Sequence, residues 1–155
     1  MTGIDAAPEN IAAARRHSVG QGLAIAYEAG EVGGLDGTFD LVTCMEVIEH
    51  VTDPAAFVRA LAARVSDRGL LVLSTPNRTV LSRIALITIG EGTGMIPRGT
   101  HDWQRFLTPE ECCALIEATG MTVIDRRGIS FSPASGLSLS DDLGLNYLVT
   151  ARPAG

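Results

Sequence analysis

Hydrophobic and polar positions along the chain predict short strands that alternate with helices. Apolar or alternating runs of strand length occur at 2–5, 23–28, 39–44, 70–74, 121–126 and 146–152. Helical spacing after a proline or an acidic residue predicts helices over 8–18, 54–65 and 108–120. Strands that alternate with helices indicate an α/β fold with a mostly parallel, doubly wound sheet.

The segment 79–100 interrupts this alternation, and we treat it as an insert. Its apolar part, 80–89, is too short to span a bilayer. Arg78 precedes the apolar part, Arg83 interrupts it, and Arg98 follows it. The segment is expected to be a lid over a greasy substrate, a helix at a membrane interface, or a helix packed on its own core.

Composition narrows the class of protein. The chain has 155 residues, 46% of them hydrophobic and 19% charged, which fits one globular domain over 1–155. Twelve basic residues against 18 acidic ones give a net charge of −6, and aromatics are only 5%, so no nucleic-acid partner is expected. Three cysteines without a CxxC pair suit the reducing cytosol.

Ligands of doubly wound sheets sit beyond the carboxyl ends of the strands, and Asp5 ends the first strand. A carboxylate there can accept hydrogen bonds from both hydroxyls of a ribose. The alternative is a surface aspartate near the start of the following helix.

A second candidate site lies in Cys44-Met45-Glu46-Val47-Ile48-Glu49-His50-Val51. Glu46, Glu49 and His50 are spaced i, i+3 and i+4, so on a helical turn they would project from one face. A carboxylate beside an imidazole can act as a general base, and the three side chains together could hold a divalent cation. The alternative is a helix start whose acids favour the dipole and whose histidine is an exposed ion-pair partner.

These residues carry a family resemblance. The run FDLVTCMEVIEHVTDP at 39–54 is similar to the fourth-strand region of class I S-adenosylmethionine-dependent methyltransferases. The segments STPNR at 74–78, PRGTHDW at 97–103 and NY at 146–147 resemble, more specifically, the ubiquinone-biosynthesis O-methyltransferases. The resemblance extends from Thr2 to about Thr150, and it implies a Rossmann-like sheet with an antiparallel strand near the C-terminus.

The resemblance also implies roles for particular residues. Asp5 matches the acid that holds the ribose of the methyl donor, and Met45 matches a residue that lines the donor pocket. Glu46, Glu49 and His50 match positions regarded as Mg²⁺ ligands in eukaryotic relatives. A cation there would lower the phenol's pKa, and without one His50, beside Glu49, would take the phenol proton.

The implied activity is O-methyl transfer from S-adenosylmethionine to a polyprenyl phenol or catechol in ubiquinone biosynthesis. The implied location is cytoplasmic, peripheral to the inner membrane through 79–100. The sequence leaves the oligomeric state open. Two alternatives remain: a non-catalytic methyltransferase-like module, or a methyltransferase for another small hydroxylated molecule.

The start of the chain departs from the family pattern. Members carry a first strand and a glycine-rich loop before the segment that matches Thr2–Asp5, whereas this chain begins at Met1. The fold is therefore expected to be N-terminally truncated, with its first strand absent. Because that strand is central in the family, the strands at 2–5 and 39–44 are expected to lose their shared neighbour.

Overall fold

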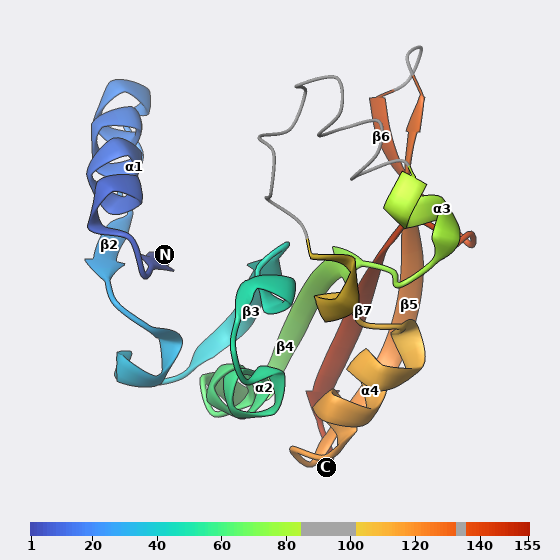
Figure 1. Ribbon diagram of the computed structural model, residues 1–155. Coiled ribbons are helices and arrows are strands. Elements are labelled where there is room, and N and C mark those ends of the chain that lie inside the picture. The colour runs from blue at the N-terminus through green and yellow to red at the C-terminus, as the bar shows by residue number, and fades with distance from the viewer. Residues whose placement is uncertain (85–101, 133–135) are drawn as a thin grey trace. The chain divides into compact units, whose positions relative to one another are not determined.

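The computed structural model describes residues 1–84, 102–132 and 136–155 (Figure 1). The chain divides into two compact units, residues 1–37 and 38–155. Each unit is described by itself below.

Unit 1 (residues 1–37) is a two-stranded parallel sheet with one α-helix. Strand β1 (Thr2–Asp5) pairs with β2 (Ala26–Ala29), and helix α1 (Pro8–Gln21) connects them. A short 3₁₀ helix, η1 (Val32–Gly34), follows β2. The helix begins at a proline, as expected, and ends at Gly22, whose φ of 66° is the left-handed conformation that glycine tolerates best.

Unit 2 (residues 38–155) is built on a five-stranded sheet in the order β3-β4-β7-β5-β6. The strands are β3 (Phe39–Met45), β4 (Val65–Pro76), β5 (Met121–Ser132), β6 (Gly136–Ser140) and β7 (Asn146–Pro153). Strands β3 and β4 are parallel, and the other three pairings are antiparallel. Figure 1 shows β7 lying between β4 and β5.

The α/β class and the antiparallel strand near the C-terminus are confirmed, but the expectation of a mostly parallel sheet is wrong. Three of the five strand pairings in the described residues are antiparallel. A parallel connection needs a crossover of about a dozen residues, whereas β5 and β6 are separated only by 133–135. So short a separation excludes a parallel crossover, and β5 pairs with β6 antiparallel.

Two helices pack on the sheet of unit 2. They are α2 (Pro54–Ala62) and α4 (Pro109–Glu117), which contact each other and the strands beneath them (Figure 1). Both start as the sequence predicts: Asp53 Oδ1 accepts a hydrogen bond from Ala56 N, and Thr108 forms a reciprocal capping box with Glu111. The shorter elements are η2 (Ile48–His50), α3 (Val80–Ser82) and η4 (Trp103–Arg105).

The core of unit 2 follows the alternation of its central strands. Alternate side chains of β4 and β7 are fully buried where the two strands pair, namely Leu71, Leu73, Thr75, Tyr147, Val149 and Ala151, and Ser74 and Pro76 at the end of β4 are buried as well. Helices add Val58, Cys112 and Ile116, also fully buried. This alternation is what a strand pair with one helix-covered face produces.

Several expected boundaries differ from the structure. Strand β4 begins at Val65, before the strand predicted at 70–74, and its pairing register with β3 shifts between Phe39 and Leu41. Strand β5 extends beyond the predicted 121–126, and β6 was not predicted. The insert 79–100 lies mostly outside the described residues, which include only its first part, 79–84.

The strands expected to lose a shared neighbour belong to separate sheets. Among the described residues, β1 pairs only with β2, and β3 pairs only with β4. Within the part of the chain that the structure describes, no helix is long and apolar enough to cross a membrane.

Candidate functional site

The candidate residues lie at the carboxyl ends of two strands, one in each unit. Asp5 ends β1 in unit 1, and Met45 ends β3 in unit 2, directly before Glu46, Glu49 and His50. Strand carboxyl ends are where ligands bind in α/β sheets, so both positions agree with the sequence interpretation.

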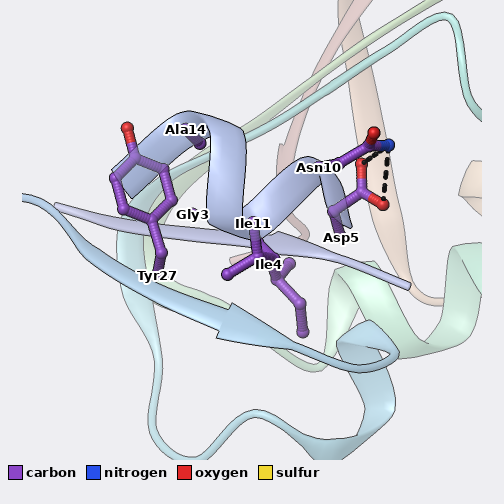
Figure 2. A pocket seen from close by; sticks show the side chains of 7 residues that line it. All are labelled: Gly3, Ile4, Asp5, Asn10, Ile11, Ala14 and Tyr27. Carbon is purple, nitrogen blue, oxygen red and sulfur yellow. Dashed lines mark hydrogen bonds between the residues drawn. The ribbon is translucent and has the colours of Figure 1, made fainter. Parts of the chain in front are cut away.

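In unit 1, Asp5 closes one end of a pocket of about 260 Å³. Its Oδ1 accepts hydrogen bonds from Ala7 N at 2.8 Å and Asn10 Nδ2 at 3.2 Å, and its Oδ2 accepts from the same amide at 3.2 Å. Figure 2 shows this pair at one end of the pocket and the Tyr27 ring at the other. Since each carboxylate oxygen can accept two hydrogen bonds, Asp5 is oriented by these contacts and retains acceptor capacity.

The pocket of unit 1 depends on a glycine. A Cβ placed on Gly3 would come within 2.9 Å of the Tyr27 ring carbons, so only glycine lets the ring lie against the β1 backbone (Figure 2). Ile4, Ile11 and Ala14 complete the lining. The pocket is therefore apolar, with a carboxylate at one end.

In unit 2, the residue after β3 has an unusual backbone. Met45 pairs with Ser74 in the ladder, and Glu46 N donates a hydrogen bond to Ser74 O at 3.1 Å. Glu46 has a φ of 54°, a left-handed conformation that is uncommon for a residue with a Cβ. The Met45 side chain is 48% exposed, so it is available to a ligand at this edge.

The Glu46 carboxylate is held by two strands. Ser74 Oγ donates to its Oε1 at 2.6 Å, and Asn146 Nδ2 donates to its Oε2 at 2.8 Å. Ser74 lies on β4 and Asn146 begins β7. We call these three residues the Glu46 bridge.

Glu49 and His50 lie on η2 but differ in environment. Glu49 is only 3% exposed, and its Oε2 accepts a hydrogen bond from Thr75 Oγ1 at 3.0 Å. The His50 side chain is 46% exposed, with Nε2 3.8 Å from Glu49 Oε1. Burial raises the pKa of the Glu49 carboxyl above its usual value, and the nearby Glu46 carboxylate adds to that rise. The pair thus places an exposed imidazole beside a buried carboxyl.

The expectation that Glu46, Glu49 and His50 share one helical face is wrong. That expectation requires a continuous α-helix, whereas Glu46 is left-handed and residues 48–50 form a 3₁₀ turn. The described residues contain no group of three His, Cys, Asp or Glu side chains arranged to hold a metal ion. The donor set therefore does not fit Mg²⁺ here, because the three side chains do not converge on one point and Glu49 is turned into the core.

Burial lowers the reactivity of two thiols and one phenol in unit 2 by raising their pKa values. Burial raises the pKa of the Cys44 thiol to about 12, and Glu49 and Glu46 add to it. The pKa of Cys112, on α4, is likewise raised to about 12 by burial. Burial raises the pKa of the Tyr147 hydroxyl above its usual value as well, and that hydroxyl donates to Leu107 O or Thr108 O, both at 3.1 Å. None of these groups is a reactive thiolate or phenolate at neutral pH.

Sequence reasoning missed the residues that orient the candidates. Asn10, Ser74, Thr75 and Asn146 hold the three carboxylates through hydrogen bonds from other elements. Asn10 follows Asp5 by five residues and could have been found as a helix-start partner. Ser74, Thr75 and Asn146 lie in the STPNR and NY segments that carry the resemblance, but their contacts join distant segments, so the sequence did not reveal which carboxylates they hold.

The adjacent residues His101 and Asp102, which a base would need in proximity, are only partly described. Asp102 Oδ1 accepts a hydrogen bond from Gln104 N at 3.1 Å, so it caps η4. His101 lies outside the described residues.

Comparison with known proteins places the chain in a family. Residues 1–126 match the family described as methyltransferase domain. The ubiquinone biosynthesis O-methyltransferase of Methylobacterium nodulans is 41% identical over 98% of this chain and 63% of its own length. The protein of the same name from Burkholderia thailandensis is 38% identical over 98% of this chain and 68% of its own length.

A solved structure shows the same fold at low sequence identity. Magnesium protoporphyrin IX methyltransferase from Synechocystis PCC 6803, solved with bound SAH, is 16% identical. It superposes with a TM-score of 0.68 over 99% of this chain and 64% of that chain.

The present chain spans a little under two thirds of the length of the first curated relatives it matches, at 61–64%. The chain belongs to the family of ubiquinone biosynthesis O-methyltransferases.

Proposed function

We propose that the chain is a methyltransferase domain over 1–155 that transfers a methyl group from S-adenosylmethionine to an oxygen of a polyprenyl phenol or catechol. The identity of about 40% to ubiquinone biosynthesis O-methyltransferases over nearly the whole chain carries this proposal. The polar residues at the carboxyl ends of β1 and β3 support it, since they lie where this fold class binds ligands.

For the methyl donor we assign Asp5 and Met45. The Asp5 carboxylate, oriented by Ala7, would accept one ribose hydroxyl at the free position of its Oδ2 and the other where that hydroxyl replaces the Asn10 amide. The exposed thioether of Met45 would pack against the donor, because a flexible, polarisable side chain adapts to an aromatic ring.

For the acceptor we assign His50 as the general base and Glu49 as its partner. The donor supplies a sulfonium methyl group. The imidazole takes the proton of the acceptor hydroxyl while that oxygen forms its bond to the methyl carbon and the carbon–sulfur bond breaks. The products are a methyl ether and S-adenosylhomocysteine, with the proton on His50. Glu49, 3.8 Å from Nε2, would stabilise the imidazolium. No step is assigned to Mg²⁺, because the side chains do not fit it.

The test is calorimetric titration of the 155-residue chain with S-adenosylhomocysteine, with circular dichroism confirming that the chain is folded. We expect micromolar binding that Asp5→Ala weakens at least about tenfold, since two hydrogen bonds to a charged acceptor are lost. Asp36→Ala, which removes an exposed carboxylate of the same unit outside the pocket, is the matched control.

A folded chain that binds no S-adenosylhomocysteine would contradict the proposal. That outcome would favour the alternative of a non-catalytic module. Binding that survives Asp5→Ala unchanged would keep the donor but remove the role of Asp5.

We further propose that the segment 79–100 makes peripheral contact with a membrane, which would suit a prenylated acceptor and a cytoplasmic location at the inner membrane. The first residues of the segment support this: Val80, Leu81 and Ile84 are 70%, 56% and 47% exposed. Co-sedimentation with phospholipid vesicles tests it, with Leu81→Ser expected to reduce binding. Equal sedimentation of variant and wild type would contradict it.

A further inference from the structure

Among the described residues, Glu46 is the only non-glycine residue with a positive φ. A left-handed backbone is disfavoured for a residue with a Cβ, so surrounding contacts must hold it there. Such strained positions cluster at functional sites, and this one immediately follows the carboxyl end of β3. Something at this edge of the sheet therefore stabilises a conformation that the local sequence does not favour.

The Glu46 bridge supplies those contacts. Both carboxylate oxygens accept short hydrogen bonds, from Ser74 Oγ at 2.6 Å and from Asn146 Nδ2 at 2.8 Å. The backbone adds the bond from Glu46 N to Ser74 O. Because Ser74 is fully buried and both donors lie on strands of the central sheet, the bridge ties the turn to a rigid support.

The turn that the bridge holds carries the proposed functional side chains. Met45 precedes Glu46 directly, and η2 with Glu49 and His50 follows within four residues. Thr75, the next residue along β4 after Ser74, holds the Glu49 carboxylate. Two adjacent residues of one strand thus fix both ends of the turn.

We propose that Glu46 is a positioning residue, which uses both carboxylate oxygens to lock the β3–η2 turn onto β4 and β7, and is not a ligand of a divalent cation. It acts through Met45 and His50, which it fixes at the edge of the sheet. The inference deepens the proposed function by assigning a role to a further residue of the same site. Its structural part also stands without methyl transfer.

An unused acceptor gives the bridge a distinctive property. Asn146 Oδ1 is buried and has no hydrogen-bond partner among the described residues. If the Asn146 amide turns over, Oδ1 can accept a hydrogen bond from a glutamine at position 46. Glu46→Gln should therefore preserve the bridge, with its Oε1 still accepting from Ser74. A cation site, in contrast, would lose a charged ligand.

The decisive experiment exchanges the donor and the acceptor of the hydrogen bond between residues 146 and 46. Asn146→Asp places a carboxylate against the Glu46 carboxylate, and Glu46→Gln in the same chain restores a donor opposite an acceptor. Four proteins are compared: wild type, Asn146→Asp, Glu46→Gln, and the double variant. Gln104→Glu, which adds one negative charge at an exposed position of unit 2, is the control for net charge.

The first readout is the equilibrium constant for urea unfolding. We expect Asn146→Asp to shift it at least about tenfold toward the unfolded state, because two carboxylates repel and a hydrogen bond is lost. The double variant and Glu46→Gln should stay within about threefold of wild type. If the double variant is no more stable than Asn146→Asp, or if both are unfolded, the proposal is overturned.

The second readout reports position, which stability alone does not. The chain has four methionines, so ¹³C-methyl labelling of methionine gives a simple spectrum in which Met45→Leu identifies the Met45 signal. Asn146→Asp should move that signal, and the double variant should return it to the wild-type position. If the Met45 methyl signal keeps its wild-type position in Asn146→Asp, the positioning role is overturned.

The third readout separates the bridge from a cation site. Mn²⁺ is added as a paramagnetic stand-in for Mg²⁺, and broadening of the Met45 methyl signal is followed. The bridge predicts no saturable broadening, in wild type or in Glu46→Gln. Saturable broadening that Glu46→Gln abolishes would overturn the proposal. Neither spectroscopic test needs methyl transfer, so a chain that fails to bind the donor still decides the matter.

Discussion

Both units combine strands with helices, but unit 1 buries far fewer side chains than unit 2. In unit 1, the 14-residue helix α1 buries only Ile11 and Ser18, and η1 and the segment after it add Val32 and Leu35. In unit 2, the nine-residue helix α4 alone buries three side chains, and it rests on a five-stranded sheet whose central strands contain fully buried residues.

The difference shows that the number of buried side chains, and not the length of a helix, predicts which unit is more rigid. A helix of α1's length is marginal in water unless an apolar face packs against something. A two-stranded sheet is likewise marginal alone, whereas three or more strands with a covered face stabilise one another. Unit 2 should therefore supply most of the stability, and unit 1 should open at lower cost.

The largest expected effect comes from the centre of unit 2. Leu73 is fully buried on β4, where it pairs with Cys44 on one side and Val149 on the other. We expect Leu73→Ala to lower the free energy of unfolding by about 2–5 kcal/mol, measured by urea denaturation. The control, Leu137→Ala, removes a side chain that is 74% exposed and should cost less than about 0.5 kcal/mol. Equal losses in the two variants would break the comparison.

A smaller and local effect is expected in unit 1. Ile11 is 5% exposed and is the only large apolar side chain that α1 buries. We expect Ile11→Ala to weaken the protection of backbone amides in residues 1–37 by about 2 kcal/mol, measured by hydrogen exchange. Amides of β4 and β7 should keep their wild-type exchange rates. If their protection falls by the same amount, the two units unfold together and the comparison fails.

The smallest effect is a pH dependence at the start of α4. The pKa of Glu111 is lowered, chiefly because its carboxylate accepts a hydrogen bond from Thr108 N and also because Arg78 lies beside it. A lowered pKa in the folded state stabilises the fold at pH above the ordinary value of 4.5, and this contribution disappears as pH falls through the lower, folded-state pKa.

Because the Glu111 side chain is 42% exposed, we expect the contribution to be about 0.5 kcal/mol or less. Urea unfolding at a series of pH values, compared with Glu111→Gln, measures it. The two proteins should differ in stability at pH 7 and converge at the acid end. A difference that stays constant down to pH 3 would contradict the assignment.

Local signals in the sequence predicted the elements well where one segment determines its own structure. Helices α2 and α4 begin at Pro54 and Pro109, close to the starts of the helices predicted over 54–65 and 108–120. Asp5 and Met45 lie at strand ends, as the apolar runs before them indicated. Such features depend on a few neighbouring residues, so their residue types reveal them.

Features that depend on distant contacts were not predictable in the same way. Nothing near Glu46 in the sequence announces a positive φ, because the contacts that hold it come from Ser74 and Asn146. Strand β6 differs: its sequence Gly-Leu-Ser-Leu-Ser alternates, and it pairs with β5, its neighbour along the chain, so a local signal for it was present.

Alkylation of the native cysteines can report how often unit 2 opens. All three are in unit 2, on β3 and α4, and Cys44 and Cys112 are buried with thiol pKa values near 12. An alkylating reagent at neutral pH can modify these two only during moments when the sheet or helix parts. The rate at which they are alkylated therefore times the opening of unit 2 without any introduced label, while unit 1, which has no cysteine, contributes nothing to the signal.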